Sequence, residues 1–226
     1  MSYVSQAEVV NIIKHNTEIR EYELRLDKER SYNPGSFVQL TLDLVTASDI
    51  WPDSRTFSIA SYKKGVMNFI IKNVGRYTDR IFDELNEGDK CTIKYPFGDL
   101  YSKNFNNEKH LLLAGGVGIT PYLGLIEYFE TIGKTDRVSL FYSVKYSVDL
   151  IHYDKLNNVL GSNLEIFTTR EQNNYFHNRR IGFEDISKVS DIDTNIYICG
   201  SKSFNTEFKS LLQENGYKKI HMDEWE

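Results

Sequence analysis

The sequence contains only two cysteines in 226 residues, Cys91 and Cys199. Two cysteines cannot ligate an iron–sulfur cluster that needs four, and a pair so far apart in the chain argues against a disulfide framework. The histidines are scattered without the spacing of metal ligands. They are His15, His110, His152, His177 and His221. The sequence therefore predicts no metal site.

The sequence also lacks a positive charge excess and a long apolar run. It has 27 basic and 32 acidic residues, a formal net charge of −5, which disfavours a nucleic-acid partner. No apolar run approaches the roughly 20 residues that span a bilayer. The N-terminal MSYVSQAEVV lacks the charged-then-apolar layout of a signal peptide. We therefore expect a cytoplasmic protein with no membrane span and no nucleic-acid partner.

The first part of the chain has the pattern of short strands separated by turns. Alternating apolar and polar residues, as in EYELRLD and QLTLDL, predict strands, and the glycines between them predict turns. The predicted strands are residues 7–16, 19–27, 36–44, 55–62, 66–74 and 89–95. A helix is predicted at residues 78–85, because Ile81, Phe82 and Leu85 then share one face. Six strands of this kind predict a small antiparallel β-barrel domain over residues 1–104.

The pattern changes after Asn104, where strands begin to alternate with helices. Strands are predicted in HLLLAGG, VSLFYSV, LEIFTTR, NIYICG and KKIHMDEW, and helices in PYLGLIEYFETIG, FEDISKV and FNTEFKSLLQENG. Apolar strands such as LLLAG and IYICG are typical of parallel sheets covered by helices on both faces. Residues 105–226 are therefore predicted to form a doubly wound α/β domain with a parallel sheet.

A glycine-rich turn joins the first strand and helix of this second domain. The stretch LLLAGGVGITPYLGLIEYF, residues 111–129, places three glycines and a proline between them. Such a turn aims backbone N–H groups and the positive end of a helix dipole at one point, where a phosphate binds well. Alternatively, the glycines only allow a tight strand-to-helix corner. Gly75, which precedes the helix predicted at 78–85, marks a second candidate anion site.

Seven short motifs together carry a resemblance to a known family. They are PGSF at 34–37, RTFS at 55–58, GRYT at 75–78, YPFG at 95–98, GGVGITP at 115–121, TRE at 169–171 and CGS at 199–201. In this order and spacing they resemble the flavin- and nicotinamide-binding module of the ferredoxin–NADP reductase family over nearly the whole chain. The resemblance implies that the barrel binds FAD and that the α/β domain binds NADPH or NADH.

In the barrel, the resemblance assigns the flavin to the RTFS motif. It implies that Arg55 contacts the flavin pyrophosphate, that Phe57 packs on the isoalloxazine, and that Ser58 lies near flavin N5, with Thr56 beside them. A guanidinium can fork onto a pyrophosphate, and an aromatic ring offers a flat face. The alternative is an ordinary barrel strand with Phe57 in the core and Arg55 in solvent.

The resemblance assigns the flavin phosphates to the GRYT motif, with Gly75, Tyr77 and Thr78. Gly75 would let the chain come close, and Thr78 would join the N–H groups of the helix start. The alternative, which is compatible with this role, is that Thr78 is an ordinary N-cap residue.

In the α/β domain, the resemblance places the nicotinamide nucleotide against the glycine-rich turn and the CGS motif. The residues implied are Gly115, Gly116, Gly118, Thr120, Pro121, Cys199 and Gly200. The Thr120 hydroxyl would face the nicotinamide, and the Cys199 thiol would lie near the nicotinamide C4 as a positioning group. The alternative for Cys199 is a buried structural cysteine.

Thr169 and Arg170 resemble the hydroxyl-plus-arginine pair that receives the 2′-phosphate of NADPH, and Arg179 and Arg180 could add charge. No acidic residue lies directly at the end of this strand, although Glu171 and Glu184 are near in sequence, so the pattern favours NADPH over NADH.

At the C-terminus, Asp223 and Trp225 resemble an acidic and aromatic pair of bacterial members. An aromatic ring there can cover the flavin and gate hydride transfer by moving aside. The alternative is a mobile tail with an incidental tryptophan.

The activity implied by the resemblance is hydride transfer from NADPH or NADH to bound FAD, followed by electron release to an acceptor. That acceptor would be a ferredoxin, a flavodoxin, an oxygenase component or a small molecule. One alternative is a reductase that uses free flavin as a substrate. Another is a nucleotide-binding sensor or subunit without enzymatic activity.

Overall fold

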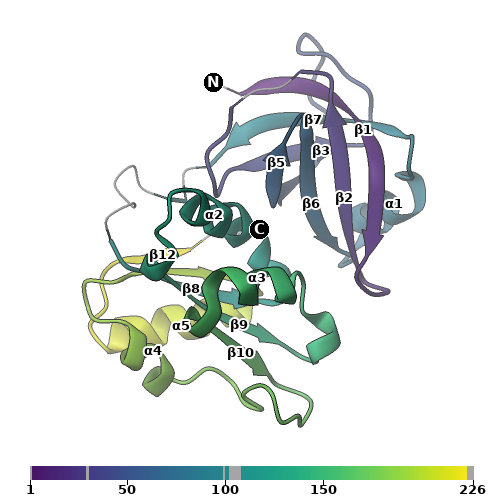
Figure 1. Cartoon of the computed structure of the whole chain (residues 1–226). Coiled ribbons are helices and arrows are strands. Elements are labelled where there is room, and N and C mark those ends of the chain that lie inside the picture. Colours follow the sequence, from purple (N-terminus) through teal and green to yellow (C-terminus); the bar gives the residue numbers. More distant parts are fainter. Residues whose placement is uncertain (1, 29–30, 99, 102–107, 223–226) are drawn as a thin grey trace. The chain divides into compact units, whose positions relative to one another are not determined.

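The computed structural model describes residues 2–28, 31–98, 100–101 and 108–222. The chain divides into two compact units, Met1–Asp99 and Leu100–Glu226 (Figure 1). The domain boundary predicted between residues 104 and 105 lies outside the described residues, so it stays a prediction. No described helix combines the length and the hydrophobicity that crossing a membrane requires.

The first unit is a seven-stranded antiparallel sheet that curls around an apolar core (Figure 1). The strands are β1 (Tyr3–Lys14), β2 (Ile19–Leu26), β3 (Phe37–Thr41), β4 (Arg55–Ser58), β5 (Ser61–Lys63), β6 (Val66–Lys72) and β7 (Lys90–Phe97). Their order in the sheet is β4-β3-β7-β1-β2-β6-β5. The alternating pattern of β2 buries Tyr22 and Leu24 completely, and Val38 and Phe69 face the same core. The predicted antiparallel barrel is confirmed.

One predicted strand, residues 55–62, is two strands in the structure, β4 and β5. β4 pairs with β3 at one edge of the sheet, and β5 pairs with β6 at the other. Between them, the N–H of Ile59 donates to Ser36 O (3.0 Å) and that of Ala60 donates to Asn68 O (2.9 Å). The expected count of six strands is therefore wrong, because the chain crosses here from one sheet edge to the other as the barrel closes.

The predicted helix is α1 (Arg76–Glu84), and it begins two residues earlier than the expected residue 78. Ile81, Phe82 and Leu85 are buried together against the barrel, as their spacing predicts. Burial of this face holds a helix that is too short to be stable alone.

The second unit is a five-stranded parallel sheet in the order β10-β9-β8-β11-β12. The strands are β8 (His110–Gly115), β9 (Val138–Val144), β10 (Leu164–Thr168), β11 (Asn195–Cys199) and β12 (Ile220–Met222), and the helices are α2 (Thr120–Thr131), α3 (Tyr153–Leu160), α4 (Phe183–Val189) and α5 (Lys202–Glu214). Helices α4 and α5 pack on one face of the sheet, and α2 and α3 cover the other (Figure 1). The predicted doubly wound domain is confirmed.

The order of these strands creates a switch point between β8 and β11. The chain leaves β8 towards β9 on one side, and it leaves β11 towards β12 on the other. In doubly wound sheets, ligands bind at the carboxyl ends of the strands where the order reverses. The glycine-rich turn follows β8, and the CGS motif follows β11, so the fold brings both motifs to this point.

Candidate functional site

In the first unit, the RTFS and GRYT motifs meet at the start of α1. The guanidinium carbon of Arg55 lies 4.8 Å from the ring centroid of Tyr77. Arg55 donates to the Asp53 carboxylate and to Ser54 O, both at 2.7 Å, and its side chain is 52% exposed. The Tyr77 hydroxyl hydrogen lies within reach of Leu40 O (3.0 Å) and Asp53 O (3.2 Å) and can be donated to either. Burial raises the pKa of the Tyr77 hydroxyl, so it remains a neutral donor.

The structural alternative for Thr78 needs a correction, because Gly75 is the N-cap residue and Thr78 is the third residue of the helix. The Thr78 hydroxyl accepts from Val74 N (2.9 Å) and Gly75 N (3.0 Å), and its own hydrogen lies within reach of Gly75 O (2.8 Å) and Asn73 Oδ1 (3.0 Å). The hydroxyl is therefore committed to the chain itself. An anion here would instead meet the N–H groups of the first helical turn, which have no acceptor within the helix.

The other RTFS residues divide between core and surface. Phe57 is partly buried and packs against the barrel core, as the structural alternative expects. Thr56 is exposed and Ser58 is partly buried. Stacking of Phe57 on a flavin and the placement of Ser58 near flavin N5 stay predictions.

In the second unit, the glycines of the turn after β8 lack a side chain for different physical reasons. A Cβ on Gly118 would lie 2.5 Å from the carbonyl carbon of Cys199 and 2.9 Å from Gly200 N, so β11 itself excludes a side chain there. A Cβ on Gly115 or on Gly200 would crowd the Phe204 ring, at 3.1 Å and 2.7 Å respectively.

Gly116 differs from these three glycines. Its φ is +56°, which favours glycine, and nothing lies within 4 Å of a Cβ built on it. The tight-corner explanation thus accounts for Gly115 and Gly118, and of the three glycines in this turn Gly116 alone borders open space.

Thr120 and Pro121 begin α2, one residue earlier than a start at Pro121. The Thr120 hydroxyl donates to Val117 O (2.7 Å) and is buried. Cys199 is the last residue of β11, is buried, and forms no disulfide. After Gly200, Ser201 caps α5 by accepting from Phe204 N (3.3 Å). The sequence pattern of a serine before a helix could have identified this cap, which directs a second helix N-terminus to the switch point.

Thr169 and Arg170 follow β10 directly, as expected. Thr169 N donates to Val144 O (3.0 Å), and Arg170 N donates to Lys145 O (2.9 Å). The side chains of Arg170 and Lys145 are both exposed, so two cations end neighbouring parallel strands. Sequence reasoning missed Lys145, because only the pairing of β9 with β10 places it beside Arg170.

The charge that Arg179 could add is already paired within the second unit. Arg179 donates two hydrogen bonds to the Asp185 carboxylate, from Nη1 to Oδ2 at 2.6 Å and from Nη2 to Oδ1 at 2.7 Å. Asp185 also accepts from Gly182 N (2.9 Å) at the start of α4. The bound guanidinium lowers the pKa of Asp185 to about 2. Arg180 pairs with Glu207 at 3.0 Å.

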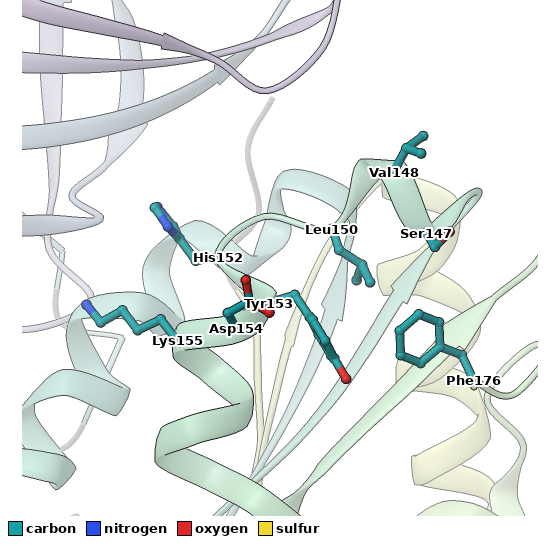
Figure 2. Close-up of a pocket in the computed structure, with 8 residues that line it drawn as sticks. All are labelled: Ser147, Val148, Leu150, His152, Tyr153, Asp154, Lys155 and Phe176. Carbon is teal, nitrogen blue, oxygen red and sulfur yellow. The ribbon is translucent and has the colours of Figure 1, made fainter.

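Two of the expected site residues, Asp223 and Trp225, lie outside the described residues. A separate pocket of about 600 Å³ opens between the turn after β9, the start of α3 and Phe176 (Figure 2). None of the residues expected from the sequence lines it. Tyr153 and Phe176 form its aromatic part, with ring centroids 5.4 Å apart in an edge-to-face arrangement.

Comparisons with known proteins agree with this geometry. Residues 112–209 match the family model described as an oxidoreductase NAD-binding domain. A ferredoxin–NADP reductase of Pseudomonas aeruginosa is 28% identical over 245 residues, covering 96% of this chain and 92% of the relative. The glycine betaine monooxygenase reductase subunit of Pseudomonas aeruginosa is 26% identical over 227 residues, covering 92% of this chain. This chain spans 60% of that relative's length.

Among solved structures, a ferredoxin NADP+ reductase from Neisseria gonorrhoeae with bound FAD and NADP has the same fold. Its TM-score is 0.81 at 20% identity, and the match covers 97% of this chain and 98% of that chain. A barrel followed by an NAD-binding α/β domain defines the class as a two-domain oxidoreductase module. Within that class, these similarities confirm the resemblance to the ferredoxin–NADP reductase family that the motifs predict.

Proposed function

We propose that the chain is an FAD-dependent NAD(P)H oxidoreductase that passes electrons to a separate acceptor. FAD is held by the first unit, and NADPH or NADH by the second. The bound flavin supplies the chemistry, because it accepts a hydride from a reduced nicotinamide and releases the electrons afterwards. The chain's own residues bind the phosphates and orient the rings.

The observation that carries this proposal is the half-exposed Arg55 guanidinium over Tyr77 at the start of α1. A pyrophosphate there would be met by a fork of N–H donors from Arg55 and by the unpaired N–H groups of the first helical turn. Free riboflavin has no phosphate to use such a site. This favours a retained FAD over a free flavin that acts only as a substrate.

Features of the second unit support a nicotinamide nucleotide at the switch point. The turn at Gly116 borders open space, and α2 and α5 both begin at this edge of the sheet. At the ends of β9 and β10, Lys145 and Arg170 present two exposed cations. A 2′-phosphate is the group of NADPH that such cations would recognise, which favours NADPH over NADH.

The acceptor is proposed from the chemistry of the relatives. One is a ferredoxin–NADP reductase and another is the reductase subunit of a monooxygenase. A ferredoxin, a flavodoxin or an oxygenase component is therefore the class of partner that we propose, with a small-molecule acceptor as the alternative.

The visible spectrum of the purified protein tests this proposal. We expect bound yellow flavin that bleaches when NADPH is added without oxygen. Arg55→Ala should weaken FAD binding by about 1.5–3 kcal/mol, the worth of charge-assisted hydrogen bonds. Arg80→Ala is the matched control, because Arg80 is an exposed arginine of α1 that pairs with Glu84.

Two other results would contradict the proposal. Colourless protein that turns over only when flavin is added indicates a reductase of free flavin. Colourless protein with no turnover in the presence of flavin and either nucleotide indicates a subunit without enzymatic activity.

A further inference from the structure

Glu171 follows Arg170 at the end of β10, where the proposed function places the adenosine ribose. In dinucleotide-binding folds, an acidic side chain in this region accepts a hydrogen bond from the 2′-hydroxyl of NADH. The same charge would repel the 2′-phosphate of NADPH. The availability of the Glu171 carboxylate therefore bears on which nucleotide the chain selects.

The Glu171 carboxylate is bound by donors of the chain itself. Ser147 donates its backbone N–H to Oε1 at 2.8 Å and its hydroxyl to Oε2 at 3.2 Å. Asn173 donates its side-chain amide to Oε1 at 3.0 Å. Ser147 is the first residue of a 3₁₀ turn that ends at Asp149, where a backbone N–H has no acceptor within the turn.

The loop that carries Glu171 is itself fixed by Asn173. The Asn173 side-chain oxygen accepts from Tyr175 N (3.0 Å) and Phe176 N (2.8 Å), and its amide nitrogen also donates to Thr168 Oγ1 (3.1 Å). Ser147 and Phe176 both line the pocket described above (Figure 2). Asn173, one of the donors to the Glu171 carboxylate, is therefore held in place by hydrogen bonds of its own.

We propose that Ser147 is a positioning residue that sets nucleotide preference by binding the Glu171 carboxylate. With that carboxylate held, Arg170 and Lys145 are the charges that meet the ribose 2′-position. The side chain of Arg170 is exposed, so it is accessible to a phosphate. This inference rests on the proposed function. It adds that Ser147 keeps the Glu171 carboxylate from repelling the 2′-phosphate of NADPH.

The variant that tests the inference is Ser147→Pro, which removes both the N–H and the hydroxyl. Proline is tolerated at the first position of a helical turn. The preceding Tyr146 has φ −131° and ψ 150°, an extended conformation that a following proline favours. Ser147→Ala is the graded control, because it removes the hydroxyl and keeps the stronger backbone N–H bond.

Binding of adenosine 2′,5′-bisphosphate and of 5′-AMP to the whole chain is measured by isothermal titration calorimetry. Ser147→Pro should weaken the bisphosphate about tenfold and leave 5′-AMP unweakened, because a freed carboxylate repels the additional phosphate. Ser147→Ala should show a smaller change. Adding Glu171→Gln to Ser147→Pro should restore bisphosphate binding, since glutamine carries no charge. Tyr175→Ala, an exposed neighbour in the same loop, should leave both affinities unchanged.

The inference is overturned if Ser147→Pro weakens both ligands equally, if it changes neither, or if Glu171→Gln fails to restore binding. In these cases wild-type binding of the bisphosphate leaves the proposed function intact. If the wild-type chain binds neither ligand and NADPH does not bleach its flavin, the proposed function fails and the inference fails with it.

Discussion

Gly118 lies where the turn after β8 meets the end of β11, and this contact leaves no room for a Cβ. A methyl group there would overlap the Cys199 carbonyl. We expect Gly118→Ala to lower the free energy of unfolding by about 3 kcal/mol or more, because backbone on both sides must move. Gly116→Ala should cost only about 1–2 kcal/mol for its left-handed conformation. Urea denaturation followed by circular dichroism measures both, and equal losses would contradict the packing argument.

Asp185 makes the stability of the second unit depend on pH in the acid range. Its folded-state pKa is lowered from 3.8 to about 2, chiefly by hydrogen bonds from Arg179. Because the pKa is depressed, the stabilisation is present above about pH 4 and is lost as the pH falls towards 2. We expect about 1–2 kcal/mol, less than the shift alone implies, because Arg179 is half exposed and solvent screens the pair.

Asp185→Asn should therefore reduce the free energy of unfolding near neutral pH and have little effect near pH 2. Urea denaturation across this pH range provides the measurement. Glu184→Gln, an acidic neighbour in the first turn of α4, is the matched control. A destabilisation by Asp185→Asn that is the same at every pH would disprove the role of the charge.

At the scale of elements, the start of α1 combines a structural hydroxyl with a candidate anion site. Thr78→Val removes the hydroxyl that accepts from Val74 N and Gly75 N, and it should cost about 1–2 kcal/mol of stability. Thr78→Ser keeps the hydroxyl and should cost less. The Thr78 hydroxyl is already hydrogen-bonded to the chain, so we expect Thr78→Val to affect stability more than FAD binding. A loss of FAD-binding free energy much larger than the loss of unfolding free energy would instead indicate that the hydroxyl binds phosphate. Thermal unfolding and flavin titration separate the two effects.

The helices and strands also show which parts of the fold the sequence pattern predicts. The period of apolar residues predicts α1 and most strands, since burial of one face follows from local order. The same pattern misses the break between β4 and β5, because hydrogen bonds to Ser36 and Asn68 decide it and these partners belong to other segments of the barrel. For the candidate site, the motifs identify Arg55 and the glycine-rich turn, whereas Lys145 emerges only from the pairing of β9 with β10.

At the scale of the whole molecule, the proposed flavin and nucleotide sites belong to separate compact units. Substitutions in one site should therefore leave binding at the other nearly unchanged. We expect Arg170→Ala to weaken NADPH by about 1–3 kcal/mol through lost charge-assisted contacts, and to leave NADH and the flavin content nearly unchanged. Anaerobic stopped-flow reduction with both nucleotides measures this, and an equal loss for NADPH and NADH would refute the NADPH preference.

The amino-acid sequence alone predicts the division into a barrel and a doubly wound domain, and it contains the motifs that carry the family resemblance. These depend on composition and on residues close together in the chain. Three contacts are visible only in the folded chain: the Cys199 carbonyl leaves no room for a side chain at Gly118, Arg179 pairs with Asp185, and Ser147 binds Glu171. Each of these contacts depends on side-chain and backbone positions that the packed fold supplies and that residue spacing alone does not encode.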